Sequence, residues 1–172
     1  AIDPMELEIG VALIRLADPE RGGDLLPRIT GVRQAIASEI GILLPKVRIR
    51  DNMQLDERHY GIKIANNVVA EGSVYPDRLL AMESGLTEGK IPGEETRDPA
   101  FGQPAVWIEL RHRERAEMLG YTCVEPAAVL ATHLKEVVRQ HADELLTRDA
   151  CKKLIDDIKN TTPAVVDELI PG

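Results

Sequence analysis

Aromatic residues are scarce in this sequence, since the 172-residue chain has one Phe, one Trp and three Tyr. Cysteine is scarcer still, and its two occurrences, Cys123 and Cys151, form no CxxC pair. This argues against a zinc or dithiol redox motif, and two isolated positions do not define a disulfide. A reducing cytoplasm is therefore the expected setting.

Long apolar runs and excess positive charge are also lacking. No window approaches the roughly 20 consecutive apolar residues that a membrane-spanning helix requires, so no membrane contact is expected. The net charge of -8 argues against nucleic acid or an anionic lipid surface as partner, because both need concentrated positive charge. With 44% hydrophobic and 29% charged residues, the sequence is typical of a folded globular domain.

One local group of basic residues stands out against the acidic total. Arg111, Arg113 and Arg115 alternate with acidic residues in a segment that reads as a helix. Such interleaving is typical of a solvated helix face, and a phosphate site is the alternative.

The first part of the chain predicts a strand, a helix and a second strand. Residues 6–16 alternate and then become apolar throughout, which indicates a partly buried strand. Residues 24–40 repeat apolar side chains at three and four positions, as one face of a helix does, with Asp24 as N-cap and Gly41 as C-terminal stop. Residues 46–51 then form a short strand.

Residues 60–75 predict a hairpin turning at Asn66-Asn67, because Asn tolerates the left-handed backbone of tight turns. Residues 81–103, rich in Gly and Pro, predict a long ordered loop or a domain boundary. A strand, a short helix and another strand are expected up to residue 125. Three helices follow at 126–146, 148–160 and 163–170. The pattern as a whole predicts an α+β fold.

Catalytic and metal-binding patterns are absent from the sequence. No nucleophile-elbow, zinc-protease, phosphate-loop or dinucleotide motif occurs. His133 and His141 lie on one predicted helix but about 12 Å apart along its axis, too far to share a metal. The residues therefore give no positive evidence of catalysis, and we expect no cofactor or metal.

The single Phe lies between two prolines, in "TRDPAFGQPAVWIE" at residues 96–109. Asp98 precedes a proline and suits a turn in which its side chain accepts backbone N–H groups. Phe101 is either a plug that closes a small core or an anchor displayed to a partner, and the residues alone favour the plug. Trp107, inside a predicted strand, is assigned to the core.

Several long blocks resemble one protein family. They include "RIRDNMQLDERHYGIKIANNVVAEGSVYPDRLLAM", "GKIPGEETRDPAFGQPAVWI", "GYTCVEPAAVLATHLKEVVRQHADELLTRD" and the final "DELIPG". The resemblance is to the large export-gate protein of bacterial type III secretion, the FlhA/InvA family, and to its flagellar branch. It runs in one register from Met5 to Gly172.

The resemblance implies a particular domain organisation. A discontinuous α+β subdomain of mixed sheet would span 5–76 and 126–145, with a small α+β subdomain inserted at 77–125. Residues 146–172 would begin a helical subdomain, and 1–4 read as an expression remnant. The membrane half of such a protein is not in this sequence, and its abrupt end suggests a piece of a longer chain.

The resemblance also implies a function. In that family this part is a non-enzymatic docking platform on the cytoplasmic face of the inner membrane, forms a nine-membered ring, and binds export chaperones carrying substrates, besides other export components. Asp98, Phe101 and Thr132 match its chaperone cleft, and Gly10 matches a position to which the subdomain arrangement is sensitive. With this resemblance, the favoured interpretation of Phe101 changes from a core plug to an anchor displayed to a partner. Val11 and Gln103 depart from the family pattern.

A rival hypothesis is a small-molecule-binding or enzymatic domain that uses the 85–103 loop as a lid. A deep pocket with convergent titratable groups would favour that rival, whereas a shallow apolar groove would favour docking. For docking we expect weak binding, in the micromolar range, and a largely monomeric 172-residue chain.

Overall fold

The computed structural model describes residues 4–145, and the predicted helices at 148–160 and 163–170 lie outside the described residues. The chain divides into two compact units, Ala1–Arg139 and Gln140–Gly172. Both sheets, the grooves and the side-chain clusters lie in the first unit.

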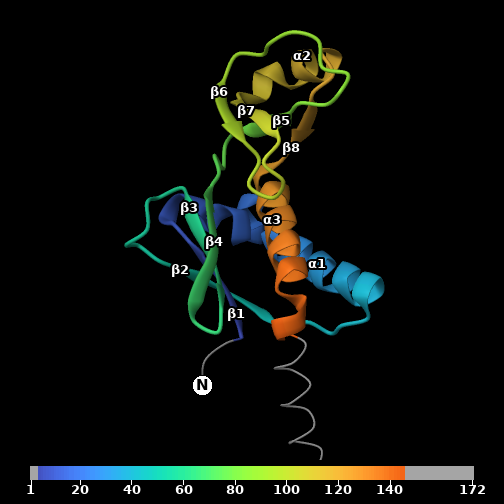
Figure 1. Cartoon of the computed structure of the whole chain (residues 1–172). Helices are drawn as coiled ribbons and strands as arrows, with labels where there is room; N and C mark the ends of the chain where they lie inside the picture. Colours follow the sequence, from blue (N-terminus) through green and yellow to red (C-terminus); the bar gives the residue numbers. More distant parts are fainter. Residues whose placement is uncertain (1–3, 146–172) are drawn as a thin grey trace, which may run out of the picture. The chain divides into compact units, whose positions relative to one another are not determined.

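The first sheet has the strand order β2-β1-β3-β4. Its strands are β1 (Met5–Ile9), β2 (Val47–Asp51), β3 (His59–Ile64) and β4 (Asn67–Ser73). β1 and β2 are parallel, and helix α1 (Leu25–Ile40) lies in the connection between them, as parallel strands require. The other two pairings are antiparallel, so the sheet is mixed. Figure 1 shows β1 to β4 grouped below the second sheet.

The predicted strand at 6–16 is wrong beyond Ile9, because Val11–Ala17 forms a 3-10 helix, η1. At Gly10 the backbone N–H still donates to the His59 carbonyl, but the Gly10 carbonyl already accepts from Leu13. The buried residues of η1 are Leu13 and Leu16, three apart, which is the period of a 3-10 helix. A short second turn, η2 (Pro19–Arg21), follows.

Helix α1 occupies the predicted residues, and its C-terminal stop is confirmed: Gly41 has φ +76° and donates its N–H to the Ala37 carbonyl. Asp24 occupies the predicted N-cap position, and its carbonyl accepts from the Arg28 N–H. The Asp24 side chain makes no cap hydrogen bond, and its carboxylate instead accepts from Arg28 Nε at 2.9 Å.

The predicted hairpin is present, but its turn lies one residue earlier than expected. The residues with positive φ are Ala65 (48°) and Asn66 (69°), whereas Asn67 already pairs with Ile64. The cross-strand register therefore decides which two residues form the turn, even though alanine is less suited than asparagine to a left-handed backbone.

The second sheet is antiparallel, with the strand order β6-β7-β5-β8. Its strands are β5 (Leu79–Met82), β6 (Glu94–Arg97), β7 (Pro104–Ile108) and β8 (Thr122–Val124), with η3 (Leu110–His112) and α2 (Arg113–Met118) between β7 and β8. The predicted loop at 81–103 is thus partly wrong, because it contains all of β6. Every residue of β6 is exposed, so the strand carries no hydrophobic alternation that could have revealed it.

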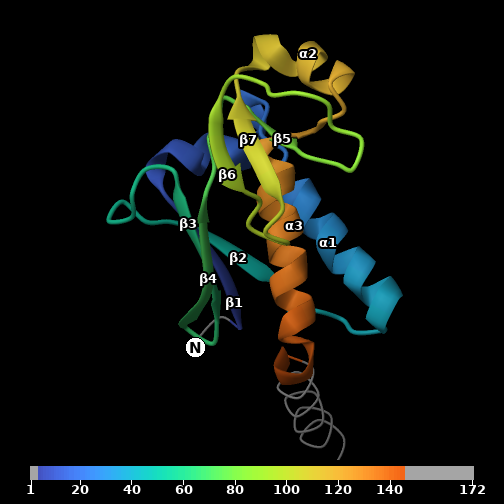
Figure 2. The same ribbon diagram turned by 45° about the horizontal axis from the view of Figure 1, so that its top comes forward.

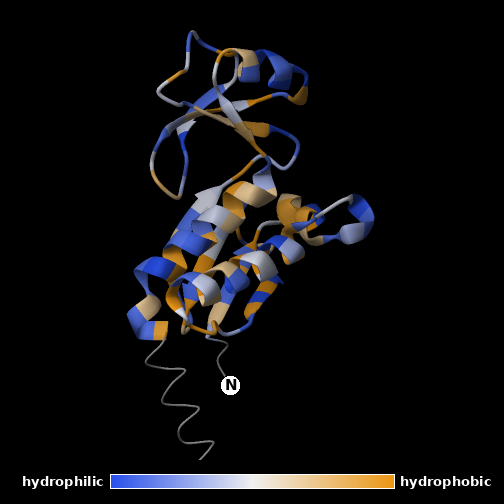
Figure 3. Cartoon of the chain, turned by 90° about the vertical axis from the view of Figure 1, so that its right-hand side faces the viewer, coloured by the Kyte–Doolittle hydropathy of each residue, from blue (hydrophilic) through white to orange (hydrophobic). Residues whose placement is uncertain are grey.

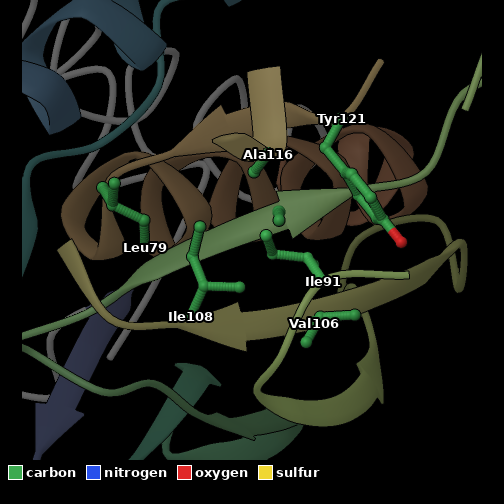
Figure 4. Close-up of a cluster of buried hydrophobic side chains, with 7 residues drawn as sticks. Leu79, Ile91, Val106, Ile108, Ala116 and Tyr121 are labelled. Atoms are coloured by element: carbon green, nitrogen blue, oxygen red, sulfur yellow. The ribbon is translucent and has the colours of Figure 1, made fainter. Parts of the chain in front are cut away.

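Two groups of buried side chains stabilise these sheets. The second sheet packs on a cluster shown in Figure 4, consisting of Leu79, Ala81, Ile91, Val106, Ile108, Ala116 and Tyr121. The fully buried residues of the first sheet include Met5, Leu7, Tyr60, Ile62 and Ile64, and helix α3 (Pro126–Gln140) contributes Leu130, Leu134 and Val138. Trp107 is 5% exposed, which confirms its assignment to the core.

Helices α1 and α3 lie side by side in both ribbon views (Figures 1 and 2). Ion pairs from Lys135 and Arg139 of α3 to Glu39 of α1 join them. Figure 3 shows hydrophobic positions interspersed with hydrophilic ones along the helices, as expected where one helix face is buried. Two small sheets with associated helices confirm the predicted α+β class. The subdomain boundaries at 76, 126 and 145 stay predictions.

Candidate partner-binding site

The turn at residues 98–103 is organised by one buried carboxylate. Asp98 is 5% exposed, and its Oδ2 accepts hydrogen bonds from the backbone N–H groups of Ala100 (3.1 Å) and Phe101 (2.9 Å). Its Oδ1 accepts from Gln103 N at 2.6 Å. Two backbone bonds, Asp98 N to the Gln103 carbonyl and Gly102 N to the Asp98 carbonyl, close the same turn. The Asx-turn interpretation of Asp98 is therefore confirmed, and the turn is held in one conformation.

Phe101 is displayed by this turn. Its side chain is 60% exposed, so the plug interpretation that the residues alone favoured is wrong. Gly102 follows with φ +72°, a conformation that returns the chain toward β7 and that glycine adopts without strain. A large apolar side chain on a rigid turn loses little conformational entropy when a partner covers it, which is what an interface anchor requires.

Thr132 is exposed on α3 and lines a groove of about 310 Å³ between α1 and α3. The groove is lined by small and apolar residues together with two cations: Gly31, Val32, Ala35, Ala128, Ala131, Arg28 and Lys135. Both cations are paired, Arg28 with Asp24 and Glu125, and Lys135 with Glu39. The centre of the groove is therefore apolar and its charges are neutralised, as in the core of a protein interface.

His133, which precedes Leu134 on α3 and follows Thr132 in the sequence, lies near the turn at residues 98–103 without lining the groove. His133 is buried, and its Nδ1 lies 2.6 Å from the Tyr60 hydroxyl. Burial lowers the pKa of His133, while the negative charge of Asp98 raises it, so the carboxylate lies within electrostatic range of α3. The structure thus places Asp98 and Phe101 in one turn. It shows no direct contact between either of them and Thr132.

Sequence reasoning missed the groove itself. Its floor comes from small residues at helical spacing on two helices, Gly31 and Ala35 on α1 and Ala128 and Ala131 on α3. Small residues spaced three or four apart on both helices are the signal that could have indicated it, because they let helix backbones approach with little side-chain filling. The sequence does not say that these two helices are neighbours.

Gly10 lies where β1 ends against the segment before β3. A Cβ at this position would lie 2.2 Å from the Asp56 carbonyl oxygen and 2.6 Å from that of Glu57, so the backbone itself leaves no room for a side chain. The backbone N–H of Ala12 donates to the Glu57 carbonyl at 2.9 Å, which fixes η1 on the same segment. Gly10 therefore sets how η1 and residues 56–59 meet.

The basic group on η3 and α2 is a solvated helix face. Arg113 pairs with Glu117 one turn later, and Arg111 pairs with Glu109, both at exposed positions. Among residues 4–145 there is no cluster of three or more His, Cys, Asp or Glu side chains that could hold a metal ion. Within the same residues no helix is long and apolar enough to cross a membrane.

The fold of this chain is that of known secretion-system domains. It superposes on the Chlamydia pneumoniae CdsV protein with a TM-score of 0.72 at 23% identity, covering 98% of this chain and 52% of that one. A cytoplasmic domain of Salmonella InvA matches with a TM-score of 0.59 at 18% identity, covering 97% and 96% of the two chains. At these identities the likeness concerns the fold alone.

Sequence comparison then defines the family. The chain is 47% identical over 171 residues to the flagellar biosynthesis protein FlhA of Bacillus subtilis, covering 99% of this chain and 25% of the relative. It is 45% identical over 167 residues to the FlhA of Helicobacter pylori, covering 97% and 23%. The model of the FHIPEP family matches residues 1–172, and the chain belongs to this family. It spans about a quarter of the length of these relatives.

Proposed function

We propose that this chain is part of the flagellar export gate and acts there as a non-enzymatic docking platform for export chaperones that carry their substrates. The observation that carries the proposal is Phe101, 60% exposed on a turn that the buried Asp98 holds in place. The apolar groove beside Thr132 would receive a second part of the same partner. Such a platform faces the cytoplasm at the inner membrane.

Relatives support the proposal at a coarser level. The similar sequences are flagellar biosynthesis proteins, and the similar folds include a nonameric cytosolic domain and a complex of CdsV with CdsO. By analogy, we propose that the full protein forms a nonameric ring and contacts further export components. The groove is apolar with paired charges, which fits docking better than the rival small-molecule site, for which convergent titratable groups would be needed.

The test is calorimetric titration of the 172-residue chain with a purified flagellar chaperone–substrate complex. We expect a dissociation constant in the micromolar range for the wild type. Phe101→Ala should weaken binding by roughly thirtyfold, since truncating an interface anchor typically costs about 2 kcal/mol. Its free energy of unfolding should stay within about 0.5 kcal/mol of wild type, because the side chain is exposed.

Met118→Ala is the matched control, because Met118 is 83% exposed, apolar and on α2. It should bind as the wild type does. Thr132→Arg places a long charged side chain in the groove and should abolish binding if the groove takes part. Wild-type affinity in Phe101→Ala, or an equal loss in Met118→Ala, would refute the role of the turn. A dissociation constant in the nanomolar range would refute the expectation of weak, quickly reversible binding.

A further inference from the structure

A second pocket lies where the chain passes from β4 to β5, away from the groove beside Thr132. Its volume is about 450 Å³, and four arginines line it: Arg15 from η1, Arg21 from η2, Arg58 before β3, and Arg78 before β5. Tyr75 forms part of its wall. No residue of this pocket lines the groove between α1 and α3.

Two of the arginines are held by an aromatic ring instead of a carboxylate. The Cζ of Arg58 lies 3.6 Å from the centroid of the Tyr75 ring, and the Cζ of Arg78 lies 4.1 Å from it. At such distances one face of the ring has room for one guanidinium group. The Tyr75 ring therefore lies between the guanidinium groups of Arg58 and Arg78. Cation–π contacts of this kind orient a guanidinium without neutralising its charge, so its N–H donors stay available.

None of the four arginines forms an ion pair within residues 4–145, in contrast to Arg28, Arg111, Arg113 and Arg139, which all do. Glu57 and Asp77 also line the pocket, which leaves two net positive charges (four minus two) in a chain whose total is -8. Like charges gathered without partners repel one another, and an anion would relieve that repulsion.

The pocket continues into a groove whose lining includes several aliphatic side chains. A neighbouring groove of about 330 Å³ shares Arg15, Pro76, Asp77 and Arg78 with it. Beyond these shared residues, the groove is lined by Leu16, Leu79, Leu110, Pro126 and Ala127, by two glycines, and by Asp24, Arg113 and Glu125. Asp24 and Glu125 are both paired with Arg28. A ligand that crossed the shared wall would meet guanidinium groups on one side and aliphatic side chains on the other.

The segment that builds the basic wall is also held by Gly10. Asp56 and Glu57 contact Gly10 so closely that a Cβ there would collide with their carbonyls. Glu57 and the next residue, Arg58, line the pocket. The position of Arg58 therefore depends on the absence of a side chain at residue 10.

We propose that these two adjoining pockets bind an acidic, extended peptide segment of a partner protein. Its Asp or Glu carboxylates accept from the guanidinium groups of Arg15, Arg21, Arg58 and Arg78, and an adjacent apolar side chain enters the groove lined by Leu16 and Leu110. Charge complementarity and the succession of basic and apolar walls identify this occupant. The site is separate from Phe101 and Thr132 and does not depend on the role proposed for them.

The test measures fluorescence anisotropy of two labelled peptides with the complete 172-residue chain. One peptide reads acetyl-Asp-Glu-Leu-Asp-Glu-Leu-amide, and its twin carries Asn and Gln in place of Asp and Glu. We expect the acidic peptide to bind and the twin to bind at least tenfold more weakly, since hydrogen bonds to charged groups contribute about 1.5–3 kcal/mol. Binding should weaken as salt rises, because the contacts are electrostatic.

Variants locate the contact. Arg15→Gln combined with Arg21→Gln removes two charges without touching the Tyr75 stack and should weaken the acidic peptide by roughly tenfold or more. Arg58→Gln should also weaken binding of the acidic peptide. Because this variant loses one cation–π contact with Tyr75, thermal unfolding is measured to confirm that it stays folded. Arg115→Gln is the control, because this arginine is exposed on α2 and lines neither pocket. It should bind as the wild type does.

Five outcomes would overturn the proposal. The first is that the acidic peptide shows no salt-sensitive binding. The second is that the uncharged twin binds as tightly as the acidic peptide. The third is that Arg115→Gln weakens binding as much as the pocket variants do. The fourth is tighter binding of inorganic phosphate alone than of the peptide, which would assign the pocket to a phosphate ligand. The fifth is sedimentation showing a dimer that the Arg15→Gln/Arg21→Gln variant dissociates, which would assign the pocket to a second copy of this chain instead.

Discussion

The two sheets of this protein are of similar size but are stabilised differently. The first is mixed and associated with the long helices α1 and α3, whereas the second is antiparallel and associated with the six-residue α2. Of the twelve largest fully buried side chains, only Leu80 and Ile108 come from the second region, β5 to β8 with α2. The first region, β1 to β4 with η1, α1 and α3, therefore has the larger core.

The two regions contribute different parts of the candidate partner-binding site. The large first core fixes the helices whose outer surfaces form the groove beside Thr132. The smaller second region carries the turn that displays Phe101, and there a hydrogen-bonded carboxylate replaces hydrophobic burial as the ordering force. A small core can present a rigid binding turn when backbone N–H groups converge on one buried acceptor.

The largest expected effects come from truncating one matched residue in each core. Ile62 and Ile108 are both 0% exposed, and Ile→Ala at either position should lower the free energy of unfolding by about 2–5 kcal/mol. Because the second cluster holds only seven buried residues, Ile108→Ala should expose the amides of β5 to β8 to hydrogen exchange while β1 and β3 stay protected.

Ile62→Ala should instead lower protection in both regions, since the first core supports the whole unit. Val68→Ala, at a half-exposed position on β4, serves as control and should change stability by less than about 0.5 kcal/mol. Equal loss of protection in both regions for Ile108→Ala would show that the two sheets unfold as one cooperative body.

A smaller effect is expected from two glycines of the first region. Gly10→Ala forces a Cβ against two backbone carbonyls and should cost about 1–3 kcal/mol, measured by chemical denaturation. Gly31→Ala, inside α1 with nothing within 4 Å, should stabilise the protein by roughly 0.5–1 kcal/mol through helix propensity. An unchanged stability in Gly10→Ala would contradict the close packing of residues 56–57.

The smallest effect is a pH dependence that originates at His133. Burial lowers the pKa of His133 below its ordinary value of 6.5, so the unfolded chain binds the proton more readily than the folded one. This contribution to stability is complete above pH 6.5 or so and declines as the pH falls through the lower folded-state pKa. Chemical denaturation at a series of pH values between about 7.5 and 5 measures the slope of the free energy of unfolding against pH.

Two variants sharpen this test. His133→Gln removes the titrating group and should flatten the slope. Tyr60→Phe removes the hydrogen bond to His133 but leaves it buried, so it should lower stability throughout this range while keeping the slope. A slope that survives in His133→Gln would assign the pH dependence to another group.

Much of the fold was readable from the sequence because its signals are local. The apolar period of residues 24–40 and the left-handed Gly41 define α1, and the alternation at 47–51 and 59–64 defines strands. The Asx turn at Asp98 was equally predictable, because an aspartate before a proline forms its hydrogen bonds within five residues. Family resemblance, and not local pattern, singled out Thr132 and Gly10.

What only the tertiary structure decided depends on contacts between distant segments. Strand β6 carries no apolar pattern and exists because β7 supplies its hydrogen-bond partners, and η1 ends β1 because Gly10 meets residues 56–57. The exposure of Phe101 likewise depends on what the rest of the chain leaves uncovered. The basic pocket around Tyr75 collects arginines from four separate segments, and no local pattern places them together. Periodicity and turn chemistry act over a few residues, whereas grooves and pockets arise only when remote elements pack.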